Sequence, residues 1–162
     1  MEQNPVFSSS SRRVGELHKW LCADLHINHR RAVEKGYRPA DHSERLARNW
    51  STLVAPEDRI YVLGDVIFSK ASQLGSWLAA VPGHKILVRG NHDMEKSAWY
   101  MRRGFDFVVE ALEDKDVLLT HVPRVPLPDH VRLNVHGHFH SMVNQEHYQE
   151  RRSEFEPYYS EN

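Results

Sequence analysis

The chain has 162 residues, of which 40% are apolar and 27% charged, and its formal net charge is -1. This length fits one domain with a single core, and the balanced charge argues against binding duplex nucleic acid through a broad cationic face. The sequence has no transmembrane span, and the single cysteine, Cys22, rules out a disulfide within the chain, so we expect a cytoplasmic protein with no membrane partner.

The N-terminal part of the chain is predicted to divide into a tail and the first strand of the domain. Residues 1–16 include four consecutive serines and carry no apolar pattern, which predicts a flexible tail before a single domain over residues 17–162. The apolar run 18–25 predicts a buried strand that leads into Asp24-Leu25-His26. Because alternate side chains of an extended strand share a face, we expect Asp24 and His26 to project together.

Helical and extended patterns alternate along the rest of the domain. A helix is expected to begin near Asn28, a candidate N-cap residue. Further helices are predicted over 41–54, 71–81 and 94–103, and strands over 60–63, 85–88, 105–112, 116–120 and 132–135. This alternation predicts an α/β layered protein, whose site should lie at the carboxyl ends of its strands.

Short polar blocks follow several of these strands. In chain order they are Asp24-Leu25-His26, Gly64-Asp65, Gly90-Asn91-His92-Asp93, His121 and Gly137-His138-Phe139-His140. Seven of these side chains offer nitrogen or oxygen to a metal and none offers a thiolate, which suits Mn, Fe or Zn better than Ca or a structural Zn site. Seven ligands exceed the needs of one ion and suit two ions that share a carboxylate and hold a phosphate.

Taken in order, the five blocks resemble the motifs of the calcineurin-like metallophosphoesterase superfamily, and the chain looks most like its small bacterial and phage members. The resemblance covers roughly residues 18–141. It implies an α/β fold in which a two-sheet β-sandwich is flanked by helices, giving four layers in the order αββα. It also implies two divalent ions, for which we expect Mn first and Fe, Zn or Ni as alternatives.

The resemblance further implies a role for each polar residue. One ion would be bound by Asp24, His26 and His140, the other by Asn91, His121 and His138, and Asp65 would bridge both. His92 is similar to the family histidine that lies over the phosphate and protonates the leaving oxygen. Asp93 would orient and charge His92, forming a pair suited to general acid catalysis.

Four further residues are candidates for contact with the substrate phosphate: His29, Arg30, Arg31 and Arg124. Arginine matches phosphate oxygens with two parallel donors. The alternative for His29, Arg30 and Arg31 is an ordinary helix start exposed to solvent.

The resemblance thus implies a hydrolase in which a metal-activated hydroxide attacks phosphorus and His92 acts as the general acid. We expect a small phosphodiester of the nucleotide type as substrate, because both of its ester oxygens are poor leaving groups that need a proton. The alternatives are a phosphomonoesterase, a nuclease acting on nucleic-acid ends, and a non-catalytic scaffold on the same fold. The oligomeric state stays open.

Overall fold

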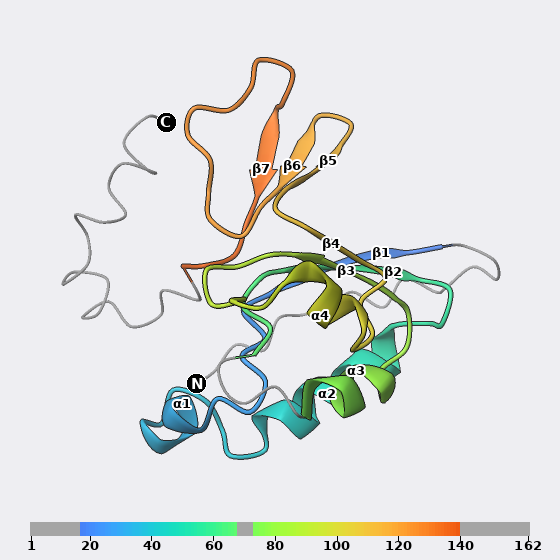
Figure 1. Cartoon of the computed structure of the whole chain (residues 1–162), viewed down its shortest axis with the longest axis vertical. Helices are drawn as coiled ribbons and strands as arrows, with labels where there is room; N and C mark the ends of the chain where they lie inside the picture. Colours follow the sequence, from blue (N-terminus) through green and yellow to red (C-terminus); the bar gives the residue numbers. More distant parts are fainter. Residues whose placement is uncertain (1–16, 68–72, 140–162) are drawn as a thin grey trace.

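The computed structural model describes residues 17–67 and 73–139, and the predicted N-terminal tail and His140 lie outside these ranges. The described elements are β1 (Lys19–Ala23), α1 (Arg30–Glu34), α2 (His42–Leu53), β2 (Arg59–Leu63), α3 (Leu74–Ala79), β3 (His84–Val88), α4 (Ser97–Met101), β4 (Phe107–Val109), β5 (Leu112–Asp114), β6 (Val117–Leu119) and β7 (Leu133–Val135). They form two sheets with helices packed beside them (Figure 1).

The first sheet is parallel throughout, with its strands in the order β1-β2-β3-β4. The last residues of three adjacent strands are in register, because Ala23 pairs with Leu63 and Leu63 pairs with Val88. The two central strands are rich in β-branched and aliphatic residues and are buried on both faces, as the neighbours Val62 and Leu63 of β2 illustrate. Consequently, the segments that follow these three strands emerge side by side at one edge of the sheet.

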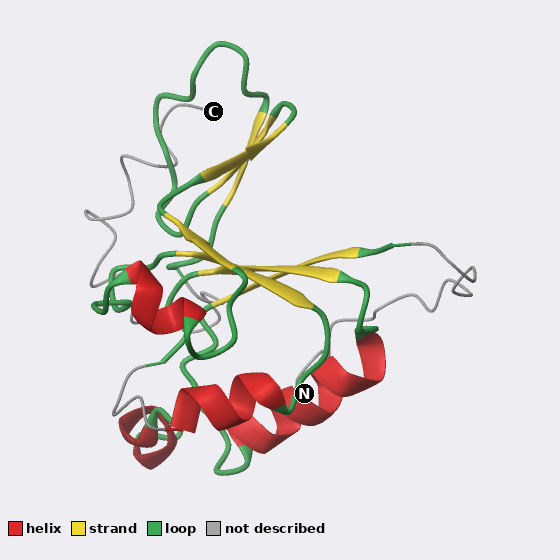
Figure 2. Cartoon of the chain, turned by 45° about the vertical axis from the view of Figure 1, so that its right-hand side comes forward, coloured by secondary structure: helices red, strands yellow, loops and turns green. Residues whose placement is uncertain are grey.

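The second sheet has three strands, with β5 antiparallel to β6 and β6 parallel to β7. It packs on one face of the parallel sheet through an apolar cluster that includes Tyr61, Leu63, Val88 and Leu119. Figure 2 shows the two sheets above one another, with the helices on the far side of the parallel sheet. Because β6 and β7 are parallel, the residues after both of them also meet at one end.

The helices cover the other face of the parallel sheet. Trp50 of α2, Leu78 of α3 and Tyr100 of α4 belong to one buried cluster with Val62 and Leu87 of the sheet. Burying such side chains supplies roughly 1.5–3 kcal/mol each, and this cluster is the main core. Within the described ranges, no helix has the length and apolar character needed to cross a membrane.

The two-sheet α/β architecture flanked by helices confirms the predicted fold class. In the described ranges the helices lie on the parallel sheet, so these residues account for three of the four expected layers. The single strand predicted over 105–112 is wrong: β4 ends at Val109 in the parallel sheet, and Leu112 begins β5 in the second sheet. One apolar run therefore serves two layers, because the chain crosses between the sheets at residues 110–111.

Candidate metal centre

Three of the predicted ligands meet where the sheets end. One ligand atom from each of Asp24, Asp65 and His121 lies within 4.8 Å of the other two, and all three residues are buried. Asp24 and Asp65 follow β1 and β2, whereas His121 follows β6 of the second sheet. Burying two carboxylates with one imidazole is costly unless positive charge compensates them, so this donor set fits a divalent cation.

A second group of donor atoms lies beside the first. The Asn91 side-chain oxygen is 2.9 Å from His121 Nε2 and 3.1 Å from His138 Nδ1. The two imidazole nitrogens are themselves 3.3 Å apart. Nitrogen and oxygen donors that converge this closely are suited to one shared cation.

The carboxylate of Asp65 stands between His121 on one side and His26 on the other. Its Oδ1 is 3.4 Å from His121 Nε2, and its Oδ2 is 3.9 Å from His26 Nε2. His26 in turn lies 4.0 Å from Asp24 Oδ1. The two oxygens of one buried carboxylate thus face different sets of ligands, which is the geometry that a bridging ligand requires.

The negative charge of Asp65 and a positive charge on His121 stabilise each other. Burial acts to raise the pKa of Asp65, but hydrogen bonds from His121 and from the His92 backbone N–H outweigh it, so the pKa is lowered. For His121, burial acts to lower the pKa, but Asp65, the Leu63 carbonyl and Asp24 together raise it. The cluster therefore favours an ionised carboxylate beside a positive group.

The backbone at the ligands is left-handed instead of extended. Asp24 (φ 53°), His26 (φ 44°), Asn28 (φ 58°), Asp65 (φ 54°) and His138 (φ 73°) are five of the six non-glycine residues with positive φ in the described ranges. Each such residue costs roughly 1–3 kcal/mol and typically marks a functional site. Asp24 and His26 project together as expected, with His26 Nε2 4.0 Å from Asp24 Oδ1. The extended strand assumed for this is wrong, because β1 ends at Ala23 and the backbone of both residues is left-handed.

Two glycines allow the ligands to approach the backbone closely. A Cβ atom on Gly64, whose φ is +79°, would lie 2.4 Å from His121 Nδ1. A Cβ atom on Gly90 would lie 2.2 Å from Asp65 Oδ1 and 2.5 Å from the Asp65 backbone nitrogen. Any larger residue at either position would displace a ligand, so the backbone itself forms part of the cradle around the cluster.

Asp93 connects two loops of the site. Its buried carboxylate accepts hydrogen bonds from the backbone N–H groups of Asp65 (2.9 Å), Val66 (3.1 Å) and Gly90 (2.8 Å). Burial raises the pKa of Asp93, although these three amides act against it. The hydrogen bonds of Asp93 thus join the Asp65 loop to the Gly90 loop. That Asp93 also orients His92 stays a prediction.

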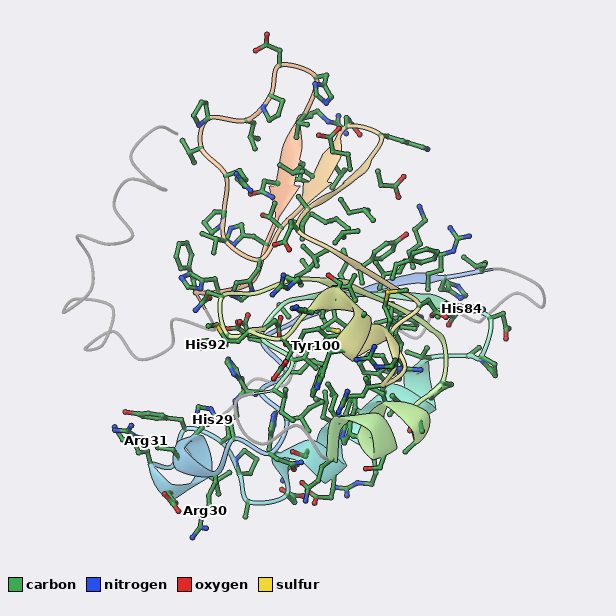
Figure 3. The ribbon with its side chains drawn as sticks, in the orientation of Figure 1. His29, Arg30, Arg31, His84, His92 and Tyr100 are labelled. Carbon is green, nitrogen blue, oxygen red and sulfur yellow. The ribbon has the colours of Figure 1, made fainter. Side chains whose placement is uncertain are left out.

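His92 lies at the open edge of the cluster. Its backbone N–H donates to Asp65 Oδ1 at 3.0 Å, while its ring nitrogen Nε2 lies 4.0 Å from Asp65 Oδ2. The side chain is 43% exposed, in contrast to 2% for Asp65. The imidazole is thus held beside Asp65 and is partly exposed to solvent (Figure 3).

The four candidate phosphate contacts are not gathered in one place. His29 lies near the cluster, with its ring centroid 5.4 Å from that of His26. Arg30 is exposed, pairs with Glu34 at 2.7 Å and points away from His92 (Figure 3). Arg31 is also exposed on α1. Arg124 lies in the exposed loop between β6 and β7. His29 is thus the candidate for which a contact with a predicted ligand is described, and the substrate contacts of the other three stay predictions.

Two residues that the sequence analysis missed support the first ligand segment. Arg38 Nη2 donates to the Asp24 carbonyl at 2.9 Å. His42 Nε2 lies 2.8 Å from the Leu25 carbonyl and 3.1 Å from Arg38 Nη1. Both residues lie outside the polar blocks, and no spacing or periodicity in the sequence marks them.

Comparisons with known proteins agree with this geometry. The family model for calcineurin-like phosphoesterases matches residues 17–159. The gene 66 protein of Mycobacterium phage L5 is 30% identical over 161 residues, covering 75% of this chain and 77% of the phage protein. The uncharacterized protein MJ1445 of Methanocaldococcus jannaschii is 29% identical over 130 residues, covering 75% of this chain and 69% of that protein.

A solved structure shares the fold. The protein of unknown function AQ665 from Aquifex aeolicus superposes with a TM-score of 0.57 at 23% identity, covering 86% of this chain and 74% of that chain.

Proposed function

Because this chain belongs to the calcineurin-like phosphoesterase family, we propose that it is a dinuclear metal-dependent phosphodiesterase that acts on nucleotide-type esters. Membership of the family supports metal-dependent hydrolysis of phosphoesters. The number of ions, the preference for diesters and the role of each residue are parts of the proposal.

The position of Asp65 carries the proposal of two ions. Its two oxygens face separate donor groups, one containing His121 and the other containing His26. We assign Asp24, His26 and His140 to one ion, Asn91, His121 and His138 to the other, and Asp65 to both. When bound, the two ions would polarise a phosphoryl oxygen and lower the pKa of a water molecule. Nitrogen and oxygen donors without thiolate favour Mn as the cofactor, with Fe, Zn and Ni as alternatives.

We assign the proton transfer to His92. Its imidazole is held next to Asp65 yet exposed, so a proton on Nε2 can be donated to the oxygen of a departing alcohol. Asn91 and His92 are both exposed, which leaves the cluster open to a phosphate that carries two ester arms. An alkyl alcohol leaves poorly without a proton, and a diester has two such groups, so this arrangement favours diesters over monoesters.

The leaving group provides the test. In the metal-loaded His92→Ala variant, kcat on diesters with alkyl leaving groups should fall about 10²- to 10⁴-fold, the usual contribution of a general acid. The loss should be clearly smaller with a nitrophenyl leaving group, which departs without a proton. Bound metal should be measured in the same samples and should be unchanged.

His84 provides a matched control. It is an exposed histidine at the start of β3, far from His92 (Figure 3). His84→Ala should leave both rates unchanged. Equal losses on both classes of leaving group in His92→Ala, with metal content intact, would show that His92 binds the phosphate and does not donate the proton. Faster turnover of monoesters than diesters by the wild-type protein would refute the diester preference.

A further inference from the structure

A groove lies beside the candidate metal centre, between α1 and the first turns of α2 and α3. It consists of two adjoining cavities of about 270 Å³ and 390 Å³. Both are lined by Asn28, Ser43, Glu44 and Gln73, so they form one continuous site. Figures 1 and 2 place these helices on the same side of the parallel sheet. The combined space is of the size that ring-containing ligands occupy in proteins.

A row of imidazoles connects this groove to the metal ligands. The ring centroids of His92 and His26 are 6.2 Å apart, and those of His26 and His29 are 5.4 Å apart. His29 also lines the first cavity. A phosphate held at the cluster would therefore have one of its two ester arms directed into the groove.

The groove walls are joined by hydrogen bonds and are thus preformed. The Asn28 side-chain amide donates to Gln73 Oε1 at 2.6 Å, and the Asn28 backbone N–H donates to Ser43 Oγ at 2.9 Å. At the far end, Trp77 Nε1 donates to the Ser43 carbonyl at 3.0 Å. Fixed walls reduce the entropy that a ligand loses on binding.

The lining is polar but carries little positive charge. Gln73 uses its oxygen to accept from Asn28, which leaves its amide N–H groups to meet the acceptors of a ligand. The half-buried ring of Trp77 offers an apolar surface. The Glu44 carboxylate lines both cavities and would accept from sugar hydroxyls while repelling a second phosphate. At the mouth, Arg30 is engaged with Glu34.

We propose that this groove binds the nucleoside arm of the phosphodiester, with the base against Gln73 and Trp77 and the sugar near Glu44. This assignment rests on the proposed phosphodiesterase function and restricts its substrates to a smaller class. Repulsion by Glu44 selects a mononucleoside ester and disfavours a nucleic-acid strand, in which a second phosphate follows the sugar.

Two substrates with the same leaving group test this proposal. The p-nitrophenyl ester of thymidine 5′-phosphate and methyl p-nitrophenyl phosphate differ only in the retained arm. The Mn-loaded wild-type protein should show a lower KM for the thymidine ester. Gln73→Ala should raise that KM about 10-fold, the scale of one hydrogen bond, and so bring the two KM values together. Asn49→Ala, which removes an exposed amide of α2 outside the groove, should change neither KM.

The role of Glu44 is tested by comparing the thymidine ester with and without a 3′-phosphate. A 3′-phosphate added to the thymidine ester should raise the wild-type KM, and Glu44→Gln should remove most of that increase. Glu57→Gln, an exposed acid outside the groove, should not. Equal wild-type KM values for the thymidine and methyl esters would overturn the groove assignment while leaving the phosphodiesterase proposal intact.

Equilibrium binding separates the two proposals in the opposite case. If the Mn-loaded protein hydrolyses neither diester, the proposed function fails. Thymidine 5′-phosphate should then still bind more tightly than methyl phosphate in calorimetry, by a margin that Gln73→Ala reduces. Equal binding of the two phosphates would overturn the groove as well.

Discussion

Arg38 shows how a single residue outside the motifs can support the ligands. It donates to the Asp24 carbonyl, and burial lowers the pKa of its guanidinium while the Asp24 charge opposes that shift. Asp24 and His26 both have a left-handed backbone, which relaxes unless surrounding contacts hold it. Arg38 is one of those contacts, so its effect should reach the metal through the shape of this segment.

Replacing Arg38 should therefore weaken metal binding without removing a ligand. We expect Arg38→Gln to raise the Kd for Mn about 10-fold, the scale of one hydrogen bond to a charged donor, and Arg38→Lys to restore part of the affinity. Calorimetric titration of Mn measures both. Arg48→Gln, which removes an exposed arginine paired with Asp41, is the control. An unchanged Kd in Arg38→Gln would mean that the Asp24 segment holds its shape unaided.

At the scale of single residues, the sequence predicted which side chains approach the site but not how they reach it. Asp24, Asp65 and His121 were predictable because each follows an apolar strand, and parallel strands end at one edge of a sheet. The left-handed backbone at Asp24 and His26 was not, because aspartate and histidine adopt it only where tertiary contacts require it. The hydrogen-bond partners of Asp93 were not predictable either, because they are backbone amides of a loop distant in sequence.

At the scale of elements, the long central patterns were predictable and the segment ends were not. The helix expected over 41–54 is α2, because its amphipathic pattern extends over several turns. The strand expected over 85–88 is β3, extended by one residue. By contrast, the helix expected over 94–103 is shorter in the structure, where α4 covers only Ser97–Met101. Arg89 explains part of this loss, because it binds the carbonyl oxygens of Asp93 and Glu95 before the helix begins.

Strand β1 carries a thiol that should be inert. Cys22 packs against the helix-side core, and burial raises the pKa of its thiol to about 12. We expect a thiol reagent at pH 8 to modify the native protein at least 10²-fold more slowly than the urea-unfolded chain, whose thiol has a pKa of about 8.5. The folded state keeps its proton between these two values, so the free energy of unfolding should fall as the pH rises above 8.5. Rapid modification of the native protein would show that β1 opens readily.

At the scale of the whole molecule, the proposed metal ligands come from both sheets. Asp24, Asp65 and Asn91 follow strands of the parallel sheet, whereas His121 and His138 follow strands of the second sheet. The sheets also pack through the apolar cluster around Leu63 and Leu119, and Lys19 of β1 pairs with Asp114 of β5. Ions shared between the sheets would therefore stabilise the folded state as a whole.

Metal should raise the melting temperature by an amount set by its affinity. At 100 times the Kd, a ligand adds about 2.7 kcal/mol to the free energy of unfolding, which corresponds to about 5–10 °C for a chain of this size. Asp65→Asn should lose most of this increase because it removes the carboxylate shared by both donor groups. Asp116→Asn, which breaks an exposed pair with Arg132, should keep it. A thermal scan with and without Mn measures the shift, and an equal shift in Asp65→Asn would contradict the shared role.

The spread of the ligands along the chain also has a consequence for synthesis on the ribosome. The parallel sheet is complete once Val109 has emerged, and at that point the chain displays Asp24, Asp65 and Asn91 but neither His121 nor His138. A nascent chain at this stage carries both carboxylates and His26 but lacks His121 and His138. Translation therefore imposes an order in which the sheet comes first and full metal loading waits for the last strands. A message truncated before codon 121 would yield a protein that folds part of its core yet binds metal poorly.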